Sequence, residues 1–168
     1  MPYEVIVDNI NREEWERYAR EFADYNIYQT QAYQGNRAEM DNQEVSRIVI
    51  RDENGKVVTM CHVRIKHIKL LTLKIGYVQW GPLVRGRDGT LKCSSPALKA
   101  LRKAYVGTKV DVLRVVPNAC NDEEGRTLVR ILRAAGFAHA SSIKPYRTLM
   151  LPVNVSEEEL RKRLSKSF

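Results

Sequence analysis

Residues 45–82, VSRIVIRDENGKVVTMCHVRIKHIKLLTLKIGYVQWGP, decide the fold. Three segments of this stretch are rich in β-branched residues, which favour strands: 45–51, 56–69 and 73–80. The first two segments are joined by Asp52-Glu53-Asn54-Gly55, and an Asn-Gly pair favours a tight hairpin turn. The third segment runs into Gly81-Pro82, where proline removes a donor from the ladder. The stretch therefore predicts a meander of three antiparallel strands.

Two helices are predicted before the meander, after a short apolar stretch at 5–7. Residues 11–24 carry apolar side chains at the spacing of one helical face: Trp15, Tyr18, Ala19 and Phe22. Asn11 with Glu14 three residues later approximates a capping box and marks the start of this helix. A second, short helix is predicted to follow Gln29 and Thr30 and to end before Asp41.

Strands and helices alternate after the meander. Ser95 is predicted to cap, and Pro96 to open, a helix whose buried side carries Leu98, Leu101 and Tyr105. A buried strand is expected over 110–116. The next helix should span 122–135 and end at Gly136, where a left-handed residue is usual. A last strand at 146–153 and a helix over 157–166, with a capping box at Ser156 and Glu159, complete the predicted order.

Composition predicts one folded domain, and the order of the predicted strands and helices places it in the α/β class. The 168 residues are 43% apolar and 29% charged, which is typical of globular domains and unlike a disordered chain. We expect a mixed, mostly antiparallel sheet flanked by helices over residues 1–153, followed by a C-terminal helix within 154–168. No run of about 18 apolar residues and no leader is visible, so a cytoplasmic protein without a transmembrane segment is expected.

The sequence gives no support for a metal site. Cys61, Cys93 and Cys120 are widely spaced, and no C-x-x-C occurs. Cys61 and His62 would point to opposite faces of a strand, and Cys61 and His67 would lie about 20 Å apart along it. A buried thiol and an ordinary surface histidine are the preferred interpretation. No G-x-S-x-G elbow or other activated nucleophile is visible either, and the catalytic residues remain unassigned.

Positive charge is the clearest chemical signal. The 28 Lys and Arg against 20 Asp and Glu give a formal charge of +8, which attracts phosphate-rich partners but names none of them. One face of the second strand would carry His62, Arg64 and Lys66, with Lys69 and Lys74 close by. This face could hold an anion or an RNA backbone, although a solvated sheet face is the commoner explanation.

The loop Arg85-Gly86-Arg87-Asp88-Gly89-Thr90 is a candidate phosphate site. It lies between a strand and a helix, where free N–H groups and the helix dipole favour anions. Arg85 and Arg87 are the candidate phosphate-binding residues. The loop lacks the pattern of a Walker sequence, so a plain solvated loop is the alternative.

Several segments, in order, resemble one known family. EEWERYAREFADYNIYQTQAY (13–33) resembles its opening helix and its aromatic-Gln-Ser/Thr-x-x-Trp/Tyr motif, and IGYVQWGPLV (75–84) resembles its Tyr-x-x-x-Gly-Pro strand end. LRAAGF (132–137) and IKPYRTLMLPVNVSEEELRKRLSKSF (143–168) are similar to its later motifs. The family is the Fem-type (FemAB/FemX-like) peptidoglycan bridge aminoacyltransferases, which are built from two domains of the GNAT acyltransferase fold.

The resemblance implies a function in cell wall biogenesis. Such a domain would form an amide by moving an amino acid from aminoacyl-tRNA to an amino group of a muropeptide, with no metal and no cofactor. A second GNAT-like domain, in cis or in trans, would complete the substrate cleft, so the chain could be inactive alone. The residues expected in the cleft wall by their position are Gln29, Tyr33, Arg37, Tyr77, Trp80 and Gly81. Core packing is the alternative for Tyr33 and Trp80.

Departures from the family leave the substrate open. Tyr33 stands where Trp is usual, Gln79-Trp80 precedes Gly-Pro, and the second domain is missing. One alternative is an acetyl-CoA-dependent N-acetyltransferase of the same fold, and another is a non-catalytic basic module that binds RNA or a protein partner. The transferase hypothesis requires a splayed sheet whose gap admits an acyl group bound to a carrier.

Overall fold

The computed structural model describes residues 3–140 and 154–163. The chain divides into two units, Met1–Ala138 and His139–Phe168, and each is described by itself. The predicted strand at 146–153 lies outside the described residues. The predicted boundary at residue 153 and the expected further domain stay predictions.

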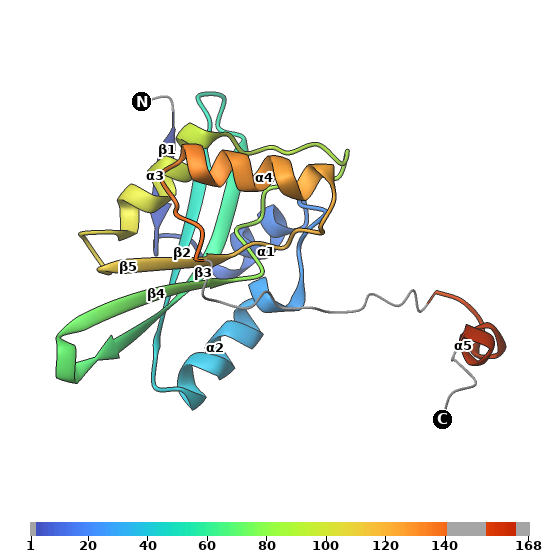
Figure 1. Cartoon of the computed structure of the whole chain (residues 1–168), viewed down its shortest axis with the longest axis horizontal. Helices are drawn as coiled ribbons and strands as arrows, with labels where there is room; N and C mark the ends of the chain where they lie inside the picture. Colours follow the sequence, from blue (N-terminus) through green and yellow to red (C-terminus); the bar gives the residue numbers. More distant parts are fainter. Residues whose placement is uncertain (1–2, 141–153, 164–168) are drawn as a thin grey trace. The chain divides into compact units, whose positions relative to one another are not determined.

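The first unit is built on a sheet of five strands in the order β1-β2-β3-β4-β5 (Figure 1). The strands are β1 (Glu4–Val7), β2 (Glu44–Arg51), β3 (Val57–Ile68), β4 (Leu73–Gln79) and β5 (Val112–Val116). The first four are antiparallel neighbours, and β5 pairs with β4 in parallel. The predicted meander is therefore confirmed as β2, β3 and β4, and the fold is mixed α/β with a mostly antiparallel sheet.

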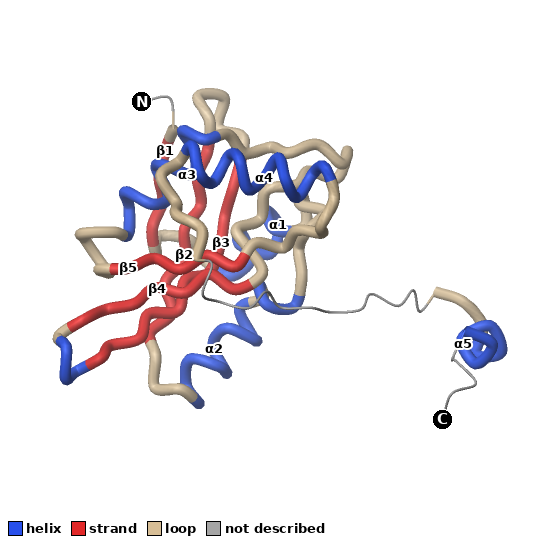
Figure 2. Tube along the Cα trace, in the orientation of Figure 1, coloured by secondary structure: helices blue, strands red, loops and turns tan. Residues whose placement is uncertain are grey.

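Helices cover both faces of this sheet, as Figure 2 shows for α2 on one side and α3 with α4 on the other. The helices and 3-10 turns of the unit are α1 (Arg12–Ala19), η1 (Ile27–Gln29), α2 (Gln31–Met40), η2 (Lys69–Leu71), α3 (Ser95–Tyr105) and α4 (Glu123–Ala134). Strand alternation divides the core between the faces. Cys61, Val63 and Ile65 of β3 pack with the residues of α3, whereas Met60 packs with Trp15 of α1.

The predicted cap at Asn11 is confirmed, Asp122 is a cap that the sequence analysis did not identify, and the predicted cap at Ser95 is wrong. Asn11 accepts the N–H of Glu14 at 2.9 Å, and Asp122 accepts that of Gly125 at 2.8 Å. In helix α3 the cap position is Ser94 and not Ser95. The Ser94 hydroxyl bonds the Tyr3 hydroxyl at 2.8 Å and does not bond a helix N–H. Gly136 adopts the predicted left-handed conformation, with φ 90°.

The apolar spacing predicts a helix that continues to residue 24, but helix α1 ends at Ala19. The chain becomes irregular here because Phe22 forms a β-bridge with Gly86. Phe22 is still buried against the same apolar cluster as Trp15 and Ala19. The spacing therefore identified the buried side chains correctly, but tertiary pairing shortened the helix.

Strands β3 and β4 separate part-way along their length, and the amide of Gln29 fills the separation. The ladder runs from Ile68 opposite Leu73 to Arg64 opposite Tyr77; continued in the same register, it would place Val63 opposite Val78 and then His62 opposite Gln79. Gln29 occupies that position instead: its Oε1 accepts the His62 N–H at 2.9 Å, and its Nε2 donates to the Gln79 carbonyl at 2.7 Å. The Gln29 amide therefore links the His62 N–H to the Gln79 carbonyl in place of one direct backbone hydrogen bond.

The two segments meet again beyond the separation. The Leu83 N–H donates to the Met60 carbonyl at 2.9 Å, and the Gly81 N–H donates to Val116 of β5 at 3.1 Å. The chain after β4 therefore follows β5 while it bows away from β3. The sheet therefore separates between β3 and β4, and the Gln29 side chain fills this separation.

The cationic face predicted for β3 is only partly solvated. His62 is fully buried, with its ring 4.1 Å from that of Trp15, and Arg64 is 6% exposed, whereas Lys66 and His67 are exposed. Helices α1 and α2 cover the first half of the strand, which periodicity within the strand could not show. Neither ring nitrogen of His62 has a partner in the part of the chain that the structure describes.

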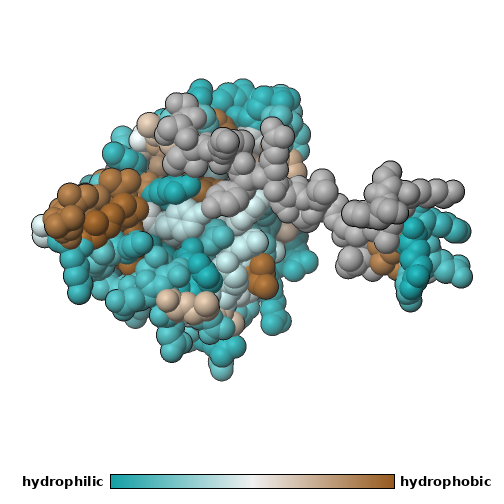
Figure 3. All heavy atoms as spheres, turned by 60° about the horizontal axis from the view of Figure 1, so that its bottom comes forward, coloured by the Kyte–Doolittle hydropathy of each residue, from teal (hydrophilic) through white to brown (hydrophobic). Residues whose placement is uncertain are grey.

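The far end of the β3–β4 hairpin is apolar and uncovered, and Figure 3 shows an apolar patch there, bordered by polar surface. Leu70 is 93% exposed and Leu71 is 67% exposed. The turn closes with Thr72 in a left-handed conformation at φ 51°.

The second unit contributes the short helix α5 (Glu157–Arg163). Ser156 accepts the N–H of Glu159 at 3.3 Å, as its predicted capping role requires, and Arg161 bonds Glu157 at 2.7 Å. The described residues contain no helix that is both long and apolar enough to cross a membrane.

We predict that Gln29→Met lowers the free energy of unfolding by about 2–4 kcal/mol, because it keeps the side-chain volume but leaves the His62 N–H and the Gln79 carbonyl unpaired. Urea denaturation measures the change. The matched control is Gln31→Met, at a half-buried glutamine on the next turn, which should shift stability by less than about 0.5 kcal/mol. Equal effects of the two substitutions would contradict the bridging role.

Stability should fall on mild acidification because of His62. Burial lowers the pKa of His62 to about 3, so between pH 6.5 and 3 the unfolded chain binds a proton that the folded chain rejects. The contribution is fully present above the unfolded pKa and is lost as pH falls, by about 2 kcal/mol between pH 6.5 and 5.

Urea unfolding at these two pH values should show that His62→Leu removes this part of the acid sensitivity. The exposed His67 offers the control, and His67→Leu should retain the wild-type slope. An unchanged slope in His62→Leu would show that His62 is hydrated or hydrogen-bonded in solution.

Candidate functional site

Arginine and aromatic side chains gather on the face of β3, β4 and β5 that also packs against α2. We call this group the arginine–tyrosine site. It contains the six residues that the sequence placed in the cleft wall and five that it did not, the latter being Tyr28, Asp41, Arg64, Gln79 and Arg114.

Arg64 is the centre of the site. Its Nη2 donates to Gln79 Oε1 at 2.8 Å, and its Nη1 lies 3.5 Å from Asp41 Oδ2. A buried guanidinium requires such acceptors because it has lost its water. Gln79 is in turn fixed through its carbonyl by Gln29, so the bridge that separates the strands also positions the partner of Arg64.

Positive charge is in excess here. Asp41 Oδ2 also accepts from Arg37 Nη2 at 3.0 Å, so one carboxylate serves two guanidiniums. Arg114 adds a third cation, which leaves the site with +2 from three arginines and one aspartate. Arg37 and Arg114 are half-exposed and are the residues that can meet an anion.

Tyr77 lies between two of the cations. It is the direct cross-strand partner of Arg64 on β3 and of Arg114 on β5, and such partners share a face of the sheet. The guanidinium carbons lie 5.4 and 5.3 Å from its ring centroid, within the range of cation–π attraction. The register of three strands therefore orients both arginines.

Aromatic rings form the adjoining wall. Trp80 stacks on Tyr28 with centroids 5.9 Å apart, and Tyr33 meets Tyr28 edge-on at 5.0 Å. Trp80 has φ 51°, and its carbonyl accepts from Asn26 Nδ2 at 2.9 Å. Gly81 is required beside it, since a Cβ there would lie 2.8 Å from Gln29 Nε2.

The structure thus brings the six predicted cleft residues together but gives them different surroundings. Gln29 is fully buried between the strands, and Gly81 packs on it. Tyr33, Tyr77 and Trp80 are half-buried, and Arg37 is half-exposed.

The sequence placed Arg64 on a cationic strand face that could hold an anion, but preferred a solvated face. Arg114 was not identified, because it lies in an apolar run. Side chains two positions apart in a strand lie on the same face of the sheet. The position of Arg114 within its strand was therefore the signal that could have assigned it to a face.

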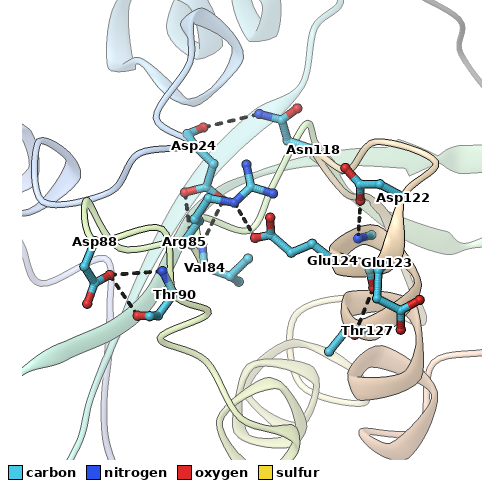
Figure 4. Close-up of polar contacts among 11 residues, drawn as sticks. Asp24, Val84, Arg85, Asp88, Thr90, Asn118, Asp122, Glu123, Glu124 and Thr127 are labelled. Atoms are coloured by element: carbon cyan, nitrogen blue, oxygen red, sulfur yellow. Dashed lines mark hydrogen bonds and ion pairs between the residues drawn. The ribbon is translucent and has the colours of Figure 1, made fainter.

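The predicted phosphate loop lies elsewhere and is engaged in its own contacts (Figure 4). Arg85 pairs with Glu124 of α4, and Arg87 Nε donates to the Arg20 carbonyl. The Gly86 N–H donates to the Thr90 carbonyl at 2.8 Å, and the Thr90 N–H donates to Asp88 at 3.1 Å. This geometry does not favour an anion cradle, and phosphate binding by Arg85 and Arg87 stays a prediction.

Asp24 anchors the start of that loop. Its buried carboxylate accepts the N–H groups of Val84 at 3.0 Å and Arg85 at 3.2 Å, and Figure 4 shows both bonds. Desolvation raises the pKa of Asp24, and these two bonds oppose the rise. The residue has a structural explanation in fixing the chain that leaves β4.

The described residues supply neither a metal centre nor an activated thiol. No group of three or more His, Cys, Asp or Glu side chains within 3–140 and 154–163 is arranged to hold an ion. Burial raises the pKa of Cys61, and it raises that of Cys93 to about 12, so both thiols stay protonated near neutral pH. The arginine–tyrosine site can instead bind an anion and position a neutral reactant.

Comparison with solved structures identifies the architecture. A probable acetyltransferase matches with a TM-score of 0.53 at 13% identity, over 89% of this chain and 99% of that one. An aminoglycoside acetyltransferase from an uncultured soil metagenomic sample, in complex with trehalose, gives 0.51 at 12% identity, over 89% and 97%. The ribosomal-protein-alanine N-acetyltransferase of Brucella melitensis biovar Abortus 2308 gives 0.50 at 16%, over 88% and 99%.

The chain has the GNAT acyltransferase fold. This confirms the fold class expected from the sequence. No family model and no curated protein matches the sequence. The finer identification with the Fem-type transferases therefore stays a prediction.

We predict that Asp41→Ala lowers the free energy of unfolding by about 1–2 kcal/mol, because Arg64 loses its carboxylate while Gln79 still accepts from it. The cost is below that of a fully buried pair because a third of the Asp41 side chain is exposed. Glu39→Ala, at an exposed position of the same helix, is the control, with a change of less than about 0.5 kcal/mol. Equal urea midpoints for the wild type and Asp41→Ala would rule out the charge balance described for Arg64.

Proposed function

We propose that the chain is an N-acyltransferase domain that takes its acyl group from a phosphate-bearing carrier, with acetyl-CoA as the first candidate donor. The observation that carries the proposal is the +2 charge of the arginine–tyrosine site, on the open face of a sheet with the acyltransferase fold. Half-exposed Arg37 and Arg114 would bind carrier phosphates, for which guanidinium groups are well suited.

The chemistry makes modest demands on the protein. A neutral amine attacks the carbonyl carbon of the donor thioester, the new C–N bond forms, and the C–S bond breaks. The amine proton leaves and the thiolate is protonated, so atoms and charge balance. The activated ester supplies the driving force, and the protein chiefly positions the reactants and excludes water.

The aromatic wall suits this positioning role. Tyr28, Tyr33 and Trp80 form a half-buried surface next to the arginines, and the rigid rings offer apolar contact at low entropic cost. The donor would lie on the face of β4 and β5, because Gln29 fills the separation between β3 and β4.

An aminoacyl-tRNA donor is the second candidate. The Fem-like motif order and the +8 charge favour it, since tRNA also presents phosphates to cationic side chains. In that case the acceptor would be an amino group of a muropeptide, and a second GNAT-like domain would be needed as partner. A basic module that binds RNA without turnover is the non-catalytic alternative.

Calorimetric titration with acetyl-CoA tests the first candidate. We expect binding that weakens as salt is raised, and Arg114→Ala should lower the affinity by about tenfold, as expected for loss of a charge-assisted hydrogen bond. Arg133→Ala, at an exposed arginine on α4, is the matched control and should bind as the wild type does.

Transfer assays with radiolabelled acetyl-CoA or aminoacyl-tRNA, and a panel of amines, then separate the donors. Transfer from acetyl-CoA supports the first candidate. Transfer from aminoacyl-tRNA alone replaces it with the second, and RNA binding without transfer from either donor overturns the transferase proposal.

A further inference from the structure

The end of the β3–β4 hairpin is an exposed apolar tip on a basic stem. Leu70 and Leu71 are 93% and 67% exposed, and three exposed lysines lie close by: Lys69 in the same turn, Lys66 at the end of β3 and Lys74 at the start of β4. Adjacent leucines are rarely left this exposed without a partner. We call this segment, residues 66–74, the hairpin tip.

The geometry points to an anionic lipid surface as the partner of the hairpin tip. We propose that Leu70 and Leu71 enter the boundary between headgroups and acyl chains while the three lysines contact anionic headgroups. Apolar insertion combined with basic flanks is the combination that holds peripheral proteins on membranes.

The lysines are available for this role. Within the described residues, no ion pair joins the ammonium group of Lys66, Lys69 or Lys74 to a carboxylate. His67 is the neighbour that is engaged, with its Nε2 3.2 Å from Glu44. A long lysine stem can also lie along the apolar surface while its charge stays in the headgroup layer.

Shape favours a bilayer over a flat protein surface. The tip is a turn that projects the two leucines from the end of a two-stranded hairpin, and Figure 3 shows the apolar patch bordered by polar surface. A short apolar projection between charges matches an interfacial boundary, where apolar and charged layers adjoin.

Charge argues against two other occupants. A second copy docked tip to tip would bring six lysines together, and like charges oppose such an interface. RNA would pair with the lysines but would leave the leucines in water, because a phosphate backbone offers them no apolar contact.

The proposal does not depend on acyl transfer. It has a geometric consequence, because Tyr77 lies on β4 seven residues from Leu70. The arginine–tyrosine site would then lie about 15–20 Å above the headgroups, at a rise of about 3.3 Å per residue with the turn subtracted.

Vesicle co-sedimentation of the full chain tests the proposal. The wild type should bind vesicles of phosphatidylcholine mixed with phosphatidylglycerol and should bind pure phosphatidylcholine much less. The double variant Leu70→Ser with Leu71→Ser should lose about tenfold or more in partitioning. The triple variant Lys66→Ser, Lys69→Ser and Lys74→Ser should lose a similar factor on anionic vesicles only.

Matched controls separate these effects from general changes in surface. Met40→Ser removes an apolar side chain that is 76% exposed on α2 and should bind as the wild type does. Lys56→Ser with Lys99→Ser and Lys103→Ser removes three exposed lysines elsewhere and should keep most of the binding. Circular dichroism establishes that each variant is folded.

A fluorescence arm reports insertion directly. Leu70→Trp, in a Trp15→Phe and Trp80→Phe background, should shift its emission to the blue on anionic vesicles. Vesicle binding that survives the leucine substitutions overturns the proposal. So does an absence of binding accompanied by self-association that the same substitutions abolish, since a second copy would then be the partner.

Discussion

The amide of Gln29 is the interaction on which the rest of the structure depends. It accepts from His62 on β3 and donates to Gln79 on β4, at the position where the ladder between these strands would otherwise continue. A glutamine amide can take the place of a backbone hydrogen bond between two strands because it carries both an acceptor and a donor. The chain after β4 is thereby held apart from β3, and its Gly81 N–H donates to the Val116 carbonyl of β5.

The separation has a second consequence, a polar layer beneath α1 and α2. Gln29, Gln34, His62 and Arg64 are all buried there, on the side of the sheet opposite the main apolar cluster. Buried polar groups must be bonded or neutral, and this layer shows both solutions. The Arg64 guanidinium has two acceptors, whereas desolvation lowers the pKa of His62 and favours its neutral form. The same layer holds the Arg64 guanidinium, which lies over the ring of Tyr77.

Sequence patterns predicted the elements well because the signals were local. The strands around the Asn-Gly turn, the cap at Asn11 and the left-handed Gly136 all follow from residues within a few positions of each other. The features that the sequence patterns did not predict correctly depend on partners that are distant in the chain. Helix α1 is shortened by a bridge to Gly86, and Arg64 is covered by a helix that precedes it in the chain by some 20 residues.

The central proposal is that an acyl donor lies on the face of β4 and β5 that carries Tyr77 and Arg114. Chemical-shift mapping of the ¹⁵N-labelled chain with coenzyme A tests it most directly. The account predicts perturbed backbone signals for 77–81 and 114–116, together with the side-chain NH₂ group of Gln29. Perturbations confined to the loop 85–90, or none at concentrations that saturate an acetyltransferase, would contradict it.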